Sequence, residues 1–293
     1  MKKTNLKNIS LAATAACLLA LPAAQASEWN AGGDGFSWED AGNWSTAGEP
    51  TLADLARINR AGGSDVFITQ AGEQADRFIL GQGATGIQKL TIESGGSLTT
   101  DSGTDSRIGQ TSEGWLTMNG GTLTMAGAYT SDTGGRLIIN DGDVNLGGNS
   151  TVGNTSAGFL EINGSTATID VAGAYTFGSF STTIFTLDSA LAGVSAVNNT
   201  GDLNLDASST LTVDFRGYDF STNKGSDIVL FDYGTLGGGG ADTFGTINFI
   251  GGFGELDYTT GGQIRLLSVV PEPSSTALLG LGLSSLLLRR KRS

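Results

Sequence analysis

A short pattern, written four times between residues 90 and 167, constrains the fold more than any other feature. Each copy has an alternating apolar segment, a turn rich in Asn, Asp, Ser or Gly, and a second alternating segment. The first leucines of the copies are 26, 21 and 23 residues apart, at Leu90, Leu116, Leu137 and Leu160. This is the spacing of successive coils in a β-solenoid. We therefore predict an all-β fold built as a right-handed parallel β-helix.

Glycine and asparagine mark the predicted corners of the coils. An apolar residue followed by Gly recurs between the copies, at Leu80-Gly81, Ile108-Gly109, Val152-Gly153 and Phe177-Gly178. Such a pair predicts an inward side chain and then a bend that a Cβ would strain. Asn-Gly turns also favour β-hairpins, so an antiparallel meander stays open as an alternative.

The chain divides into five predicted parts. After residue 181 the repeat gives way to strands with a period of two residues, which predict an additional C-terminal β unit or widened final coils. A signal helix at the N-terminus and a short hydrophobic helix at the C-terminus flank this body. The predicted parts are a signal peptide (1–26), an aromatic cap (27–75), solenoid repeats (76–180), a β-rich domain (181–269) and a sorting tail (270–293).

Charge argues against nucleic acid as a partner. The whole chain has a net charge of -13, but residues 27–273 carry 9 basic and 29 acidic side chains, a net of -20. Such a surface repels phosphate backbones. The 39% of apolar residues is enough for a packed core rather than a disordered chain.

The N-terminus has the three regions of a secretory signal. Three early lysines precede an apolar run over residues 9–21, and Ala24 and Ala26 form a small-residue cleavage site before Ser27. Cys17, the only cysteine, allows a lipoprotein alternative, although the apolar run continues beyond it. We predict secretion, with a mature chain that starts at Ser27.

Three of the four tryptophans fall close together, at Trp29, Trp38 and Trp44. One interpretation is a surface on which indole rings stack against sugars. The other is a cap, because the first coil of a solenoid has no neighbour on one side and needs large apolar side chains to cover it. We favour the cap.

The residue types present exclude much catalytic chemistry. The chain has no histidine, and its single cysteine lies in the predicted signal peptide, so Ser-His-Asp and Cys-His catalysis are absent. Hydrolysis by paired carboxylates, or lyase chemistry with Arg or Lys as base, stays open. However, no acid recurs at matching positions of adjacent copies, so we predict that the chain is not an enzyme.

Two acidic turns are candidates for calcium. Asp101 and Asp105 lie in one Gly-containing turn, and Asp141 and Asp143 lie in another. Oxygen ligands at this spacing suit a hard cation, but neither turn is a complete EF-hand loop. Solvated turn residues are the alternative, and we predict no obligatory cofactor.

The last segment has three ordered parts. Pro271, Glu272 and Pro273 are followed by an apolar run over residues 277–288. The chain then ends on a basic cluster that would stay on the cytoplasmic side, namely Arg289, Arg290, Lys291 and Arg292. The apolar run is short for a helix that spans about 30 Å of hydrocarbon. A plain C-terminal membrane anchor is one interpretation.

The same order of motif, apolar helix and basic end resembles the PEP-CTERM sorting signal. The opening pattern of Trp38, Asn43, Trp44, Pro50 and Asp54 also looks like the N-termini of Gly-rich β proteins that carry this tail. The repeats resemble autotransporter-like solenoids in general style only.

The resemblance implies a processing route. An exosortase would recognise Pro271-Glu272-Pro273, cut nearby, and release the body after transient anchoring in the inner membrane. The destination would be the cell surface or extracellular matrix, often alongside exopolysaccharide. We predict a structural or adhesive protein, and the alternative is a carbohydrate-binding or polysaccharide-cleaving β-helix.

Overall fold

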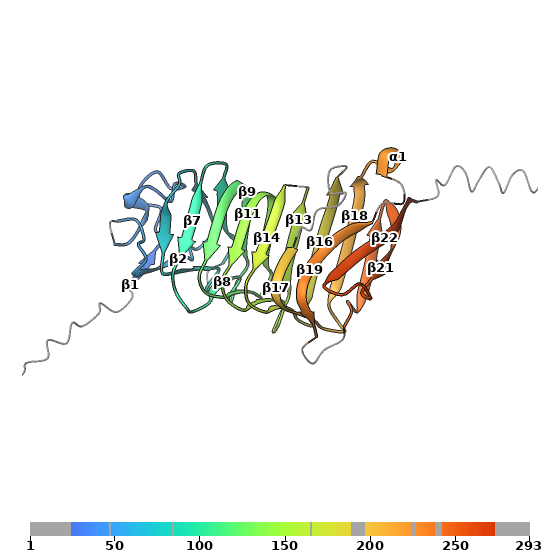
Figure 1. The fold of residues 1–293 in the computed structure, drawn as a ribbon. Helices are drawn as coiled ribbons and strands as arrows, with labels where there is room; N and C mark the ends of the chain where they lie inside the picture. The colour runs from blue at the N-terminus through green and yellow to red at the C-terminus, as the bar shows by residue number, and fades with distance from the viewer. Residues whose placement is uncertain are drawn as a thin grey trace, which may run out of the picture.

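A computed structural model describes residues 25–272, except residues 47, 84, 165, 189–196, 224, 226 and 238–241. It is an elongated stack of strands that winds through about seven turns. Figure 1 shows β1 at one end of the stack and β21 and β22 at the other. The predicted signal helix and the predicted C-terminal helix lie outside the described residues.

The coils are built from strands that form three stacks, and within each stack neighbouring strands run parallel. The first stack contains β1 (Gln25–Glu28), β2 (Asp54–Ile58), β5 (Arg77–Leu80), β8 (Ser106–Ile108), β10 (Tyr129–Ser131), β12 (Ser150–Val152), β15 (Tyr175–Phe177) and the end of β17 (Val197–Leu205). The second contains β3 (Ser64–Ile68), β6 (Gln88–Glu93), the first half of β9 (Gly114–Met125), the first half of β11 (Gly135–Leu146), β13 (Gly158–Asn163), β16 (Ser181–Asp188), β18 (Thr210–Gly217) and β20 (Thr246–Ile250). The third contains β4 (Glu73–Ala75), β7 (Ser97–Thr100), the second halves of β9 and β11, β14 (Ala167–Val171), the start of β17 and β19 (Ile228–Leu236).

The repeat leucines stack in the predicted register. Leu116 lies opposite Leu90 and Leu137, and Leu137 lies opposite Leu160. All four side chains are fully buried. The prediction of a parallel β-solenoid is therefore confirmed and the antiparallel meander is wrong for the repeats, whereas the right-handed winding stays a prediction.

The core follows from the alternation of side chains along each strand. In β6 and β13 buried residues alternate with half-buried ones, because successive side chains of a strand point to opposite faces. Stacking equivalent positions every coil then aligns the inward residues into continuous apolar columns. Burial of each such Leu or Ile contributes about 1.5–3 kcal/mol.

Corners between the second and third stacks lie inside long strands. β11 continues through its corner with a register shift, and Gly142 there has φ +96°. A Cβ at Gly142 would lie 2.3 Å from the Gly121 carbonyl oxygen of the coil before. The close approach of the two coils therefore requires glycine at this corner.

An asparagine ladder runs along the same corner. The Asn140 Nδ2 donates to Asn119 Oδ1 at 2.9 Å, and the Asn163 Nδ2 donates to Asn140 Oδ1 at 2.9 Å. Asn119 in turn donates to the Glu93 carboxylate at 3.2 Å. Each bond joins one coil to the next, so the turn residues of the repeat also hold the coils in register.

Three tryptophans close the N-terminal end of the stack. The Trp44 ring lies edge-on to Trp29 and Trp38, with centroids 5.1 and 4.7 Å apart, and its Nε1 donates to the Trp38 carbonyl at 2.8 Å. The short 3-10 helix η1 (Ala41–Asn43) leads into Trp44, and Ser37 bridges Phe67 in β3. Strands β2 to β4, which fall within residues 27–75, already stack on the next coil.

At the C-terminal end, the second stack continues with parallel strands, whereas the third stack is followed by an antiparallel strand. β16, β18 and β20 continue the second stack as parallel strands, so the first part of the predicted β-rich domain, up to Ile250, extends the solenoid with wider coils. The addition at this end is antiparallel: β22 (Gln263–Pro271) pairs with β19 and with β21 (Gly252–Asp257). A one-turn helix, α1 (Phe220–Asn223), lies beside β22.

Glu73 should make stability depend on pH. Burial in the first coil, together with Glu49 and Glu39, raises the pKa of Glu73 to about 7. Between pH 4.5 and 7 the folded chain therefore binds more protons than the unfolded chain, and its stability falls as pH rises through this window. The carboxylate lies at the rim of the stack, where water screens charge, so we expect a loss of about 1 kcal/mol.

The variant Glu73→Gln tests this dependence. It should raise the midpoint of thermal unfolding by about 2–4 °C at pH 8 and leave it unchanged at pH 5. The matched control is Glu113→Gln, because the Glu113 side chain is exposed to solvent. Equal effects of Glu73→Gln at both pH values would contradict the expectation.

Candidate sorting site

The last strand of the body runs directly into the Pro-Glu-Pro motif. β22 ends at Pro271, which lies opposite Gly252 of β21. Proline has no N–H to donate, so the end of a strand is one of the few places in a sheet that accept it. Along β22, Val269 is buried and Val270 is exposed, which is the alternation of a strand that covers a core.

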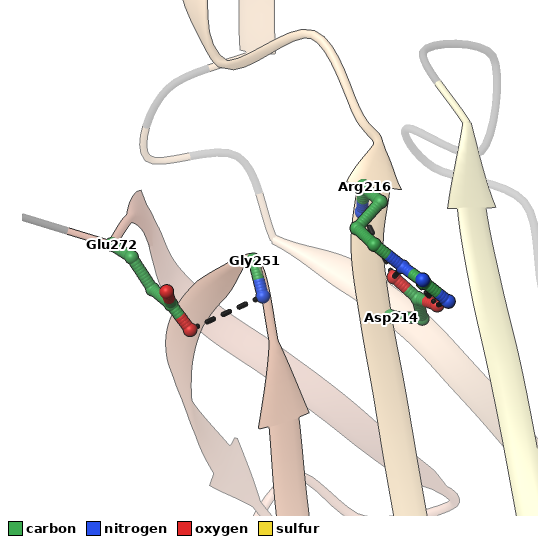
Figure 2. A network of polar contacts seen from close by, with 4 residues as sticks. All are labelled: Asp214, Arg216, Gly251 and Glu272. Carbon is green, nitrogen blue, oxygen red and sulfur yellow. Dashed lines mark hydrogen bonds and ion pairs between the residues drawn. The ribbon is translucent and has the colours of Figure 1, made fainter. Parts of the chain in front are cut away.

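Glu272 is bound to the body through its side chain. Its carboxylate accepts a hydrogen bond from the Gly251 N–H at 3.2 Å, as Figure 2 shows. Gly251 has φ +75°, a left-handed conformation that glycine adopts without strain. The tight turn between β20 and β21 thus presents an N–H group to the second residue of the motif.

An ion pair lies next to this turn. The Arg216 Nε donates to both carboxylate oxygens of Asp214, at 3.0 and 2.9 Å. The Arg216 Nη2 also contacts this carboxylate. The hydrogen bonds from Arg216 hold the pKa of Asp214 below its usual range. A Cβ built on Gly251 would lie 3.3 Å from the Arg216 side chain, so the pair leaves little room for a larger residue in the turn.

Figure 2 shows the two interactions on adjacent segments, one at the end of β18 and one between the β20–β21 turn and the start of the tail. The arrangement contains no nucleophile with an adjacent base. It holds the end of β22 against the body and exposes Pro271 and Glu272 to solvent. These residues therefore form an exposed peptide segment that another protein can bind, and they lack the groups of a catalytic centre.

The stacked coils define the described body as a parallel β-solenoid. Residues 269–292 match the PEP-CTERM protein-sorting motif, so the chain carries the signal of an exported, surface-directed protein processed by an exosortase. No curated protein sequence and no solved structure matches the chain.

Much of the predicted tail lies outside the described residues. This applies to Pro273, to the apolar run over residues 277–288 and to the basic cluster of Arg289, Arg290, Lys291 and Arg292. None of the helices in the described part of the chain has both the length and the apolar character that crossing a bilayer demands.

The predicted signal cleavage site is described in part. Ala24 lies outside the described residues, while Ala26 and Ser27 belong to β1, where they lie opposite Leu55 and Ala56. Ser27 is buried, and its hydroxyl lies 2.9 Å from the Thr46 hydroxyl. A mature chain starting at Ser27 would keep Ser27 and Glu28 of this strand, and the cleavage itself stays a prediction.

The three N-terminal tryptophans do not form an exposed platform. Trp29, Trp38 and Trp44 are 4%, 0% and 1% exposed. With the indole rings packed edge-on against one another and buried in the core, they have no surface to offer a sugar ring. Their burial contradicts the stacking interpretation and fits the predicted cap.

The four candidate calcium ligands lie in two separate turns. Asp105 accepts from Thr130 at 3.3 Å, and Asp143 accepts from Thr168 at 2.6 Å. Asp101 is exposed, and Asp141 accepts from the N–H of Gly142 at 2.8 Å. Across the described residues, no three carboxylates come close enough to hold a metal ion.

Sequence reasoning missed the turn that binds Glu272 and the ion pair beside that turn. Gly251, Asp214 and Arg216 are far from Glu272 in the chain and carry no local motif. The alternation of Ile264 and Leu266 breaks at Ser268, so no period-two signal extends the last strand to Pro271.

Proposed function

We propose that this chain is an exported, non-enzymatic structural or adhesive protein of the cell surface or extracellular polysaccharide matrix. An exosortase would process its tail after the apolar run over residues 277–288 has held the chain transiently in the inner membrane. The observation that carries the proposal is the continuity of the sorting motif with the last strand of a solenoid. A stack of this kind can present many equivalent contacts to a polymer.

The outer surface of the solenoid supports a matrix role. Outward positions repeat from coil to coil, as in the asparagine ladder and in the pairs Thr168–Asp143 and Asn198–Asp170. Hydrogen-bonding groups at a regular spacing suit weak contacts with a polysaccharide at many points. Exopolysaccharide is therefore the partner that we propose, with no cofactor.

The test of sorting follows the intact mass and the cell fraction of the protein in its host. The wild-type chain should be found outside the cell without residues 289–293, and Glu272→Gln should accumulate several-fold in the membrane fraction with these residues retained. The control is Glu255→Gln, which removes a carboxylate from β21 outside the motif. Release of Glu272→Gln at the wild-type rate would argue against recognition of the motif.

The matrix role has its own measurement. The released body should co-sediment with the exopolysaccharide of its host and should not shorten it. Turnover of any polysaccharide in a panel, abolished by neutralising one carboxylate, would instead support the enzymatic alternative.

A further inference from the structure

Exposed apolar side chains gather where the chain leaves the body. Among the described residues, seven large hydrophobic side chains are exposed, and four of these lie on the last three strands. Ile250, Phe253 and Val270 form what we call the exit patch, with exposed fractions of 39%, 47% and 40%. The fourth, Ile247, ends the inward column of the second stack, which no further coil covers.

The exit patch lies beside the point at which the sorting tail begins. Phe253 and Val270 are directly opposite each other in the β21–β22 ladder, so their side chains lie on the same face. Ile250 precedes Gly251, whose N–H binds the Glu272 carboxylate (Figure 2). Isolated exposed hydrophobic residues need no explanation, but a cluster beside one exit point does.

The spacer that follows is short. Five peptide steps separate Glu272 from Ala277, where the apolar run starts. Since an extended residue spans at most about 3.6 Å, Glu272 can lie no more than about 18 Å from the beginning of that run. If the run is in the membrane, this end of the solenoid is therefore at the lipid surface.

We infer that the exit patch docks on the lipid of the inner membrane, on the face away from the cytoplasm, before the tail is cut. This inference rests on the anchoring that we propose for residues 277–288. Phe253, Ile250 and Val270 would enter the headgroup boundary, where aromatic and aliphatic side chains are stabilised. Three side chains are too few to hold an acidic protein on lipid by themselves, so docking depends on the tail, which raises their effective concentration at the surface.

A lipid surface fits the patch better than a second copy of this chain does. The patch adjoins the tail on every molecule, so the spacer brings each patch to lipid without a need for a partner molecule. Two copies that met through this end would also bring together the acidic side chains near it, Glu255 and Glu272. Like charges at such an interface oppose association.

The experiment uses the full chain, produced in a host without an exosortase and reconstituted into phosphatidylcholine vesicles. An environment-sensitive dye is attached to Phe253→Cys, with Cys17→Ser removing the only natural thiol. Phe180→Cys and Phe36→Cys are matched controls, because these side chains are 55% and 54% exposed and lie outside the patch. Flotation reports anchoring, iodide quenching reports docking, and thermal unfolding verifies that each labelled chain is folded.

Vesicles should lower iodide quenching at position 253 by about threefold and leave positions 180 and 36 unchanged. A chain that floats with vesicles but shows equal quenching at the three positions would overturn docking alone. A chain that does not float would overturn the anchoring and the docking together. Protection that grows with the protein-to-lipid ratio would assign the patch to a second copy and overturn the lipid assignment.

Discussion

A disulfide between positions 253 and 270 should block processing of the tail. In Phe253→Cys/Val270→Cys the two cysteines occupy directly opposite positions of an antiparallel pair, at a separation that a disulfide spans. The matched sorting motif begins at residue 269, and its first three residues lie in β22. A protease binds its substrate as a free extended segment, so the end of β22 must leave β21 before it is read. We expect oxidation to slow processing at least about tenfold, measured as the fraction of chain that retains residues 289–293.

Reductant should restore processing, and the reduced form of the same variant is the reference rate, because Phe253 and Val270 belong to the exit patch and Val270 lies within the matched motif. The control is Asp232→Cys/Gln263→Cys, which locks the beginning of the same strand to β19 and leaves its end free. Oxidised control protein should be processed normally. If the oxidised 253–270 variant were processed as fast as its reduced form, the exosortase would read the motif while it is still docked on the body.

The parallel architecture could be predicted because its signal is local and repeated. Leu90, Leu116, Leu137 and Leu160 align because each coil has nearly the same length, so equal spacing in the sequence becomes register in space. Corner glycines were predicted from the same repetition. Gly81, Gly109 and Gly153 are left-handed, and a Cβ at Gly178, whose φ is not positive, would lie 2.6 Å from the Gly153 carbonyl oxygen.

The ends of the solenoid were harder to predict because they break the repeat. Strands β2 to β4 lack the sequence pattern of the later copies, but their inward residues, such as Val66 and Ile68, still fill the apolar columns. At the other end, Pro271 suggested the beginning of a separate tail, although a strand can end on a proline that donates no hydrogen bond.

The candidate site could be predicted only where it is contiguous. Pro271 and Glu272 form a motif that the sequence displays directly. The contact between Glu272 and Gly251 depends on the antiparallel register of β21 and β22, and no repeat specifies that register. The exit patch exists because β20 is the last strand of the second stack, so no further coil covers its side chains. The sequence does not show which strand ends a stack.

Trp44→Ala should open the N-terminal end of the solenoid. The Trp44 ring is 1% exposed and packs edge-on between Trp29 and Trp38, so its removal leaves a large cavity in the cap. Substitutions of this kind cost about 3–5 kcal/mol. Because each coil of a solenoid contacts only its neighbours, the loss should be local. Hydrogen exchange should accelerate at least about tenfold in β1 to β3 and remain slow in β13 and β16, and the first thermal transition should fall by several degrees.

Trp44→Phe separates packing from hydrogen bonding in the same cap. Phenylalanine keeps an aromatic ring between the other two but cannot donate to the Trp38 carbonyl, which Trp44 Nε1 reaches at 2.8 Å. We expect it to lose about 1–3 kcal/mol, less than alanine does. Uniformly faster exchange along the whole body in Trp44→Ala would mean that the coils unfold as one cooperative unit. Unchanged exchange in β1 to β3 would mean that the three tryptophans do not cap the stack, because a cap must protect the strands that it covers.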